Sequence, residues 1–240
     1  MIVEGRAYVR GGLQDCCISV ENGRIAEIKR TLKGDEKLRF GGIILPAGID
    51  LHVHFREPGL TRKEDFLSGT TAAACGGITC AFDMPNTLPP ATTPERIEEK
   101  VAAVERKAFV DFGLYAGLTE RSDVKGLAET ATAFKTYLAA SEGDLAVGDF
   151  AKLLELREDL SAAGKFISVH CEDPGLIRDV EAKRLEGHLA SRPDSAEVGG
   201  IEMAERLKGS RVHVAHVSSE RGLTSLASTD LTSEVTPHHL

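Results

Sequence analysis

The chain has 240 residues, of which 42% are hydrophobic and 28% charged, a composition typical of a globular protein and not of a disordered or fibrous one. Its 29 Lys and Arg are outnumbered by 37 Asp and Glu, and a net charge of −8 argues against nucleic acid as a partner, because such binding needs clustered positive charge. No apolar run approaches the ~20 residues of a membrane helix, and the first residues lack the basic and apolar regions of a secretory signal.

The five cysteines, an odd number without a CxxC pair, do not form the pattern of a disulfide framework. They lie in apolar surroundings at Cys16, Cys17, Cys75, Cys80 and Cys171. We expect reduced core thiols, which is typical of a cytoplasmic protein. With no signal for a membrane segment, no association with a membrane is expected.

Residues 1–48 predict a small β domain of the sandwich type. Two segments of alternating polarity flank Asn22-Gly23, and Asn-Gly between such segments is the strongest short signal for a hairpin. Gly11-Gly12 and Gly41-Gly42 separate the neighbouring short strands. A β unit of this size is too small to hold a core by itself.

From Ile49 onward the pattern changes to strand, loop and helix in repetition. The predicted strands are Gly48–His54, Ile78–Asp83, Asp111–Gly117, Thr132–Leu138, Lys165–Glu172, Arg211–Val217 and Leu231–Thr236. Alternating strands and helices predict a parallel sheet covered by helices, and a long series without reversal favours a closed eight-stranded barrel. Because only seven strands can be counted, we expect residues 49–240 to form an incomplete TIM-type (β/α)8 barrel whose C-terminal part is missing.

Three helix starts are indicated by capping residues. Thr61 and Glu64 have the spacing of a capping box ahead of a helix that ends at Gly76-Gly77. Thr93-Pro94-Glu95 supplies an N-cap, a proline in the first helical position and an acid near the positive end of the helix dipole. Asp149 is expected to cap a third helix.

Candidate metal ligands lie at the ends of four predicted strands. His52 and His54 close the first strand, and their spacing puts both imidazoles on one face. Lys135 lies near the end of the fourth strand, His170 ends the fifth and His216 ends the sixth. The carboxyl ends of barrel strands meet at one rim, where four imidazoles and an amine would repel one another if charged but could surround metal ions. The alternatives are structural histidines and a lysine whose amine reaches solvent.

Three further histidines have less certain places. His213 and His216 are separated by an odd spacing, so a regular strand cannot point both into the barrel. We expect His216, nearer the strand end, to face the site and His213 to be structural. His238 and His239 follow the seventh strand and reach the rim, and one of them is a candidate for substrate contact.

Two residues beyond the strand ends are suited to bind an anionic substrate. Arg56 follows His54 by two residues, and its guanidinium can grip a carboxylate through two parallel hydrogen bonds. The alternative is a structural ion pair with Glu57 or Asp65. Asn86 lies just past the second strand, where its amide can bind the same carboxylate or a ring carbonyl, the alternative being a turn residue.

These residues lie in segments that resemble the dihydroorotases of the cyclic amidohydrolase family. The segment DLHVHFREPG over 50–59, followed by KEDF over 63–66, looks like the family's first motif. Its later motifs are matched in order by DMPNT over 83–87, VHCED over 169–173, AHVS over 215–218 and TPHHL over 236–240. The N-terminal hairpin is similar to the small β domain of these enzymes, so the resemblance covers the whole chain.

The resemblance implies a site with two Zn²⁺ per subunit. His52 and His54 would hold one ion, His170 and His216 the other, and Lys135 would bridge them as an N-carboxylated lysine. Some relatives carry Asp at the bridging place. The implied activity is the reversible, zinc-dependent hydrolysis and cyclisation between dihydroorotate and N-carbamoyl-L-aspartate in pyrimidine biosynthesis. Arg56 and Asn86 would bind the substrate carboxylate.

The chain departs from the family in its length. Members normally continue into an eighth strand whose Asp is a metal ligand and the general acid/base, so no catalytic acid/base is expected within 1–240, and it is expected beyond Leu240. The 240-residue form is therefore expected to have little activity of its own. The implied partners are a small-molecule substrate, a second copy in a homodimer when the protein is full length, and aspartate transcarbamoylase.

Two other functions remain open from the sequence. An allantoinase or a dihydropyrimidinase-type cyclic amidase would share the histidines but would not need Arg56 to pair with a substrate carboxylate. A non-catalytic dihydroorotase-like scaffold subunit would be expected to have lost metal ligands, whereas all five candidates within this length are present.

Overall fold

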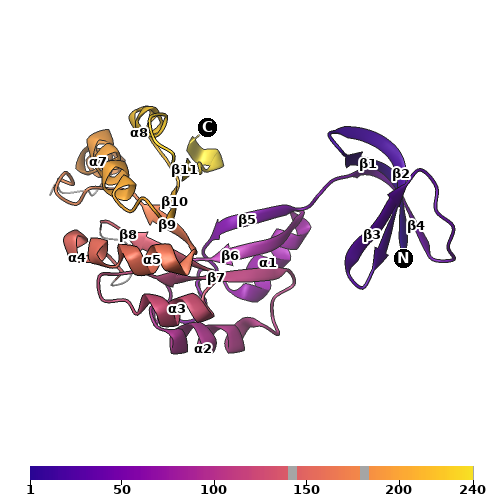
Figure 1. The fold of residues 1–240 in the computed structure, drawn as a ribbon, viewed down its shortest axis with the longest axis horizontal. Helices are drawn as coiled ribbons and strands as arrows, with labels where there is room; N and C mark the ends of the chain where they lie inside the picture. The colour runs from indigo at the N-terminus through magenta and orange to yellow at the C-terminus, as the bar shows by residue number, and fades with distance from the viewer. Residues whose placement is uncertain (140–144, 179–183, 240) are drawn as a thin grey trace. The chain divides into compact units, whose positions relative to one another are not determined.

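The computed structural model describes residues 1–139, 145–178 and 184–239. The chain divides into two compact units, Met1–Gly48 and Ile49–Leu240. Each unit is built on its own sheet, of four strands in the first and seven in the second (Figure 1). The division falls where the sequence pattern changes. It remains a prediction that the first unit is a sandwich-type domain and that the second is a barrel domain lacking its C-terminal part.

The N-terminal unit is a four-stranded sheet with the strand order β3-β2-β1-β4. The strands are β1 (Ile2–Val9), β2 (Gly12–Glu21), β3 (Arg24–Lys29) and β4 (Lys37–Ile44). The pairs β1–β2 and β2–β3 are antiparallel, whereas β1 and β4 are parallel. Asn22 and Gly23 have φ values of 51° and 73°, the left-handed pair that a tight hairpin turn requires, so the predicted hairpin is confirmed.

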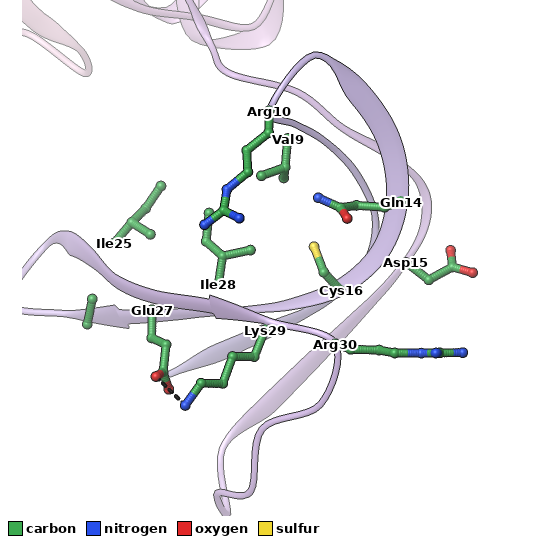
Figure 2. A pocket seen from close by; sticks show the side chains of 11 residues that line it. Val9, Arg10, Gln14, Asp15, Cys16, Ile25, Glu27, Ile28, Lys29 and Arg30 are labelled. Atoms are coloured by element: carbon green, nitrogen blue, oxygen red, sulfur yellow. Dashed lines mark ion pairs between the residues drawn. The ribbon is translucent and has the colours of Figure 1, made fainter.

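One face of this small sheet is hollowed. Only Ala7, Cys16 and Ile18 form a buried cluster, and every residue of β3 is exposed. A cavity of about 560 Å³ lies against β2 and β3, where Glu27 and Lys29 form an ion pair at 2.5 Å (Figure 2). None of the predicted site residues lines this cavity.

The second unit contains a seven-stranded sheet in sequential order, β11-β10-β9-β8-β7-β6-β5. Its strands are β5 (Gly48–Val53), β6 (Ile78–Asp83), β7 (Asp111–Gly117), β8 (Ala133–Tyr137), β9 (Phe166–His170), β10 (Arg211–Val214) and β11 (Thr232–Ser233). The pairs from β6 to β11 are parallel. In Figure 1 the sheet curves as part of a barrel, with α2, α3, α5 and α7 on its outer side. The predicted α/β fold, with a seven-stranded sheet that curves as part of a barrel and a separate small β sheet, is confirmed.

The helices follow the strands as the pattern predicts. They are α1 (Phe66–Cys75), α2 (Pro94–Val104), α3 (Val124–Thr130), α4 (Phe150–Glu155), α5 (Arg157–Ala163), α6 (Leu185–Ser191), α7 (Asp194–Glu205), α8 (Glu220–Leu226) and the 3₁₀ turn η1 (Pro237–His239). The side chain of Thr93 caps α2 and that of Asp149 caps α4, so both predicted starts are confirmed. No helix in the described parts of the chain is both long and apolar enough to cross a membrane.

The predicted start of α1 is wrong. The N-cap is Asp65, whose carboxylate accepts from Ser68 N at 2.8 Å, and not Thr61. The buried carboxylate of Glu57 also accepts from Phe66 N at 3.1 Å. The helix therefore begins where two carboxylates satisfy its first N–H groups, and the second of these comes from outside the local capping pattern.

The two faces of the curved sheet have different neighbours. Phe134, Ile167 and Val214 belong to the large buried cluster of the unit, which includes Leu127, Leu160 and Ile201 of the helices. Side chains alternate along a strand, so Lys135 lies on the opposite, inner face from Phe134. Lys135, which has no exposed surface, therefore lies in the interior of the partial barrel.

Four of the five cysteines lie at buried or half-buried positions. Cys16, Cys17 and Cys171 are buried, Cys80 is half-buried and Cys75 is exposed. All five are free thiols, as predicted, but the prediction of a core position is wrong for Cys75. It is the last residue of α1, on a turn whose other residues are also largely solvent-exposed.

Candidate active site

Four histidines gather at the carboxyl ends of β5, β9 and β10. The ring centroids of His52 and His54 are 5.3 Å apart, and those of His52 and His216 are 5.4 Å apart. The rings of His170 and His216 are separated by 4.9 Å. Strands distant in sequence thus bring together the four histidines that the sequence analysis selected.

The two histidines at the carboxyl end of β5 each have their Nδ1 atom occupied. His54 Nδ1 donates to Asn86 Oδ1 at 2.7 Å, and His52 Nδ1 contacts the carboxylate of Glu234. An amide oxygen or a carboxylate accepts only, so in both rings the hydrogen lies on Nδ1. The Nε2 lone pairs of His52 and His54 therefore remain available for a ligand.

The other two histidines present a different pair of nitrogens. His170 Nε2 lies 2.7 Å from a carboxylate oxygen of Glu172, which leaves Nδ1 as the nitrogen with the lone pair. That Nδ1 faces His216 Nε2 at 3.1 Å. Two nitrogens at this separation could both reach one zinc ion at the usual ~2.0–2.1 Å.

His216 reaches the cluster because the strand has already ended. β10 stops at Val214, and His216 has φ = 40° in the left-handed region, so the strict alternation of a strand no longer applies. His213 also turns inward: its ring packs on Phe166 at 4.9 Å and its Nδ1 lies 2.9 Å from Thr232 Oγ1. The alternation on which the choice between the two histidines rested therefore does not extend to His216, and the structural role expected of His213 stays a prediction.

Lys135 is fully buried beside the cluster. Its Nζ donates to Ser168 Oγ at 3.3 Å and lies 5.2 Å from the centroid of the Tyr137 ring. Burial lowers the pKa of this amine to about 8, against the opposing attraction of Glu234. A substantial neutral fraction of the amine near neutral pH is what reaction with CO₂ requires.

Burial also keeps two of the imidazoles neutral. The pKa of His54 is lowered to about 4, first by burial and then by the neighbouring His52. The pKa of His216 is lowered to about 3 by burial and by Lys135 and His170. Neutral imidazoles are the form that binds metal ions, so these two are ready to act as ligands at neutral pH.

The region of Arg56 borders the same cluster. The charge of Arg56, whose backbone is left-handed with φ = 63°, contributes to the lowered pKa of His54. Of its predicted alternative partners, Glu57 contacts Lys107 and Asp65 caps α1. Asn86 is buried, and its Oδ1 is already used by His54.

A buried ion pair supports the loop that carries these residues. Lys100 Nζ lies 2.5 Å from Asp83 Oδ2, and both side chains are almost completely buried. The other carboxylate oxygen of Asp83 accepts from Phe55 N at 2.7 Å, and Lys100 also donates to Met84 O at 3.2 Å. Helix α2 is thereby tied to the residues that immediately follow both His54 and Asp83.

Sequence reasoning missed two carboxylates that contact the histidines. Glu172 contacts His170 and Arg192, and these partners lower its pKa against the effect of burial. Glu234 contacts His52 and lies 3.4 Å from His213 Nε2. Both follow the observed strands β9 and β11 at the same rim, whereas the predicted strands were too long and included them, and carboxylates at these strand ends are the signal that could have revealed them.

A cavity of about 710 Å³ opens beside the cluster. It is lined by residues from the loops after β9 and β10 and from α6, α7 and η1, including His170, Glu172, Arg192, His216 and His239. His239 thus lines a cavity shared with two of the predicted ligands, and it is one of the two histidines considered for substrate contact.

The donor set fits divalent metal ions in its chemistry. In the described parts of the chain, no three His, Cys, Asp or Glu side chains form a ready-made ligand group. The four imidazole rings nevertheless lie close together, with centroids 4.9–5.4 Å apart in three neighbouring pairs, and the charge of the buried Lys135 lowers the pKa of His54 and His216. Such a set of nitrogen donors suits zinc.

Comparison with known proteins places the whole second unit in one family. Residues 43–239 match the family model described as the amidohydrolase family. The chain belongs to the amidohydrolase family. It is 39% identical over 242 residues to the dihydroorotase of Methanothermobacter thermautotrophicus, covering 93% of this chain and 54% of that protein. It is also 36% identical over 264 residues to the allantoinase of Rubrobacter xylanophilus, covering 100% of this chain and 58% of that protein.

Solved structures of this family share the fold. The L-hydantoinase (dihydropyrimidinase) from Arthrobacter aurescens matches with a TM-score of 0.84 at 27% identity, over 98% of this chain and 58% of that one. A D-hydantoinase matches with a TM-score of 0.85 at 26% identity, over 99% of this chain and 57% of that one. This amidohydrolase chain spans little more than half the length of the curated relatives it matches.

Proposed function

We propose that this chain is the metal-binding part of a dihydroorotase, which interconverts dihydroorotate and N-carbamoyl-L-aspartate in pyrimidine biosynthesis. The observation that carries the proposal is the placement of Arg56 and Asn86 beside His54, at the edge of the four-histidine cluster. A guanidinium and a side-chain amide at this place suit a ring substrate that bears a carboxylate. Dihydroorotases from Methanothermobacter thermautotrophicus and Thermococcus kodakarensis, 39% and 37% identical to the chain, support it.

In this proposal the histidines hold two zinc ions. His52 and His54 would hold the first ion, and His170 and His216 the second. Lys135, if N-carboxylated, would be a ligand shared by the two. Bound zinc ions supply Lewis-acid polarisation of the amide carbonyl and activation of a water molecule.

The protein's own groups orient the substrate. Arg56 binds the carboxylate, and the Nδ2 of Asn86 donates to the same group while its Oδ1 keeps the hydrogen bond from His54. Asn86 is buried and Arg56 half-buried, so both side chains are partly shielded from bulk water. His239, which lines the adjacent cavity, is a further candidate for contact with substrate.

The proposal assigns no general acid/base to residues 1–240. The carboxylate for that role comes from a segment outside these residues, in keeping with relatives that are nearly twice as long. A homodimer of the longer protein and association with aspartate transcarbamoylase belong to the same proposal.

Hydrolysis of allantoin or of an unsubstituted ring amide is the second candidate function. The allantoinase of Rubrobacter xylanophilus and the hydantoinase structures favour it. Neither of these substrates has a ring carboxylate for Arg56 to bind, which is why dihydroorotate is preferred here. A scaffold without catalytic function is disfavoured because all five predicted ligands are present.

Substrate preference tests the proposal. The longer protein that includes this chain is incubated with zinc and bicarbonate and assayed with dihydroorotate, allantoin and hydantoin in parallel. The proposal expects the highest kcat/KM with dihydroorotate. A clear preference for allantoin or hydantoin would replace it with the second function, and zinc binding without turnover of any of the three would favour the scaffold.

A further inference from the structure

Glu234 is held firmly at the rim by its own backbone. Its N–H donates to Val214 O at 3.1 Å, and its carbonyl accepts from Val217 N at 2.9 Å. Both partners belong to β10 or to the loop that follows it, so Glu234 is fixed relative to the segment that carries His216. A side chain on so constrained a backbone has few directions in which it can point.

Both oxygens of the Glu234 carboxylate face imidazoles. Oε1 contacts His52 Nδ1, and Oε2 lies 3.4 Å from His213 Nε2. His213 is itself held between the Phe166 ring and Thr232 Oγ1, which lies 2.9 Å from its Nδ1. A continuous chain of contacts thus runs from β11 through His213 and Glu234 to His52.

We propose that Glu234 is a positioning residue for His52, and that His213 braces the Glu234 carboxylate. The carboxylate keeps the hydrogen of His52 on Nδ1 and fixes the plane of the ring, so that Nε2 is presented to the metal ion. The inference rests on the proposed function, since it assigns His52 as a ligand. Carboxylates that accept from a ligating histidine commonly raise metal affinity by 10–100-fold.

The neighbouring contacts agree with this role. Of the two ligands proposed for the first ion, His54 has the amide of Asn86 on its Nδ1, whereas His52 has a carboxylate. Glu234 is the carboxylate in contact with His52, and its charge also acts to raise the pKa values of Lys135 and Tyr115. The carboxylate of Glu234 therefore contacts His52 and also acts electrostatically on Lys135.

The first test observes the metal-free protein. Long-range ¹H–¹⁵N NMR of the imidazoles reports which nitrogen of His52 bears the hydrogen. The inference expects a single Nδ1–H form in the unsubstituted protein and a mixture of both forms in Glu234→Ala. Glu205→Gln, an exposed carboxylate on α7, is the matched control and should leave His52 unchanged.

The second test measures zinc affinity by competition with a chelator. Glu234→Ala is expected to weaken one of two bound zinc ions about 10–100-fold, with the second ion little affected. Glu234→Gln keeps an acceptor oxygen and should weaken the same ion less, and His213→Gln should do so through loss of the brace. Thermal unfolding of each metal-free variant shows whether it is folded, and Glu234→Gln serves if the alanine variant is not.

The outcomes separate this inference from the proposed function. If the unsubstituted protein binds no zinc, both fail. If it binds two ions and neither Glu234 variant changes affinity or the His52 form, the inference is overturned and the proposed function stands. Complete loss of one ion with an unchanged His52 form would make Glu234 a direct ligand and would also overturn it.

Discussion

The side-chain amide of Asn86 offers two atoms with different chemistry. Its Oδ1 accepts from His54 Nδ1 at 2.7 Å, which leaves Nδ2 as the donor for a substrate carboxylate. Only the second task could be predicted for Asn86 from the sequence, because the partner of its amide oxygen comes from another strand, 32 residues earlier in the chain. At this residue, ligand orientation and substrate binding are therefore separable.

A pair of substitutions separates them. Asn86→Asp keeps an acceptor for His54 but replaces the donor by a charge that repels a carboxylate. Zinc affinity should therefore be retained, while kcat/KM for dihydroorotate falls roughly 30–150-fold, which corresponds to a loss of about 2–3 kcal/mol of transition-state stabilisation. Asn86→Ala loses both groups, and zinc affinity should fall as well. Steady-state kinetics and chelator competition measure the two effects, and full kcat/KM in Asn86→Asp would contradict the assignment.

Arg56 provides the second test at this scale. Replacement by Lys keeps the charge but removes the planar fork of the guanidinium. KM for dihydroorotate should therefore rise, and kcat/KM should fall by an amount that corresponds to about 2–3 kcal/mol of lost transition-state stabilisation. Arg96→Lys, on an exposed face of α2, is the matched control and should leave both unchanged. Kinetics of Arg56→Lys equal to those of the control would mean that Arg56 has a structural role only.

At the scale of elements, one carboxylate joins α7 to the start of α8. Glu197 accepts from the N–H groups of Ser218 and Ser219 at 2.7 and 2.9 Å and from both of their hydroxyls. Ser219 is also the N-cap of α8. The side chain of Glu197 thus fixes the loop that follows His216 to α7.

We expect Glu197→Gln to destabilise the protein by about 2–3 kcal/mol, because an amide offers one acceptor oxygen where the carboxylate offers two. Urea unfolding monitored by circular dichroism measures the change. Glu202→Gln, an exposed position on the same helix, is the control. Equal stability of the two variants would show that the four contacts contribute nothing net.

The buried pair between Asp83 and Lys100 leads to a larger expected effect. Lys100→Met leaves the Asp83 carboxylate buried without its partner, which should cost about 3–5 kcal/mol of unfolding free energy. The double variant Asp83→Asn with Lys100→Met should recover part of that loss. Urea unfolding checks both, and a Lys100→Met protein as stable as the unsubstituted one would contradict a paired buried charge.

Local signals predicted elements well and their boundaries less well. The Asn22-Gly23 hairpin and the caps at Thr93 and Asp149 depend on neighbouring residues, and all three are confirmed. The start of α1 was wrong because Glu57, nine residues before Phe66, also satisfies its N–H. The alternation that set His213 against His216 does not apply, because β10 ends before His216, which no periodicity in the sequence indicates.

At the scale of the whole second unit, the sheet order creates the candidate site. Parallel strands in sequential order bring the ends of β5, β9 and β10 to one rim, so histidines separated by more than a hundred residues become neighbours. The candidate ligands followed from this topology alone. Glu172 and Glu234 did not, since their partners depend on side-chain directions that only the three-dimensional structure gives.

The central proposal is that the histidine cluster and Lys135 bind two zinc ions. Elemental analysis of the protein, loaded with zinc and bicarbonate and then freed of excess metal, tests it most directly. We predict about two zinc ions per chain, falling to about one in His170→Ala, with the control Glu202→Gln, at an exposed position on α7, unchanged. Zinc content near zero in the unsubstituted protein, or equal content in His170→Ala and the control, would contradict the account.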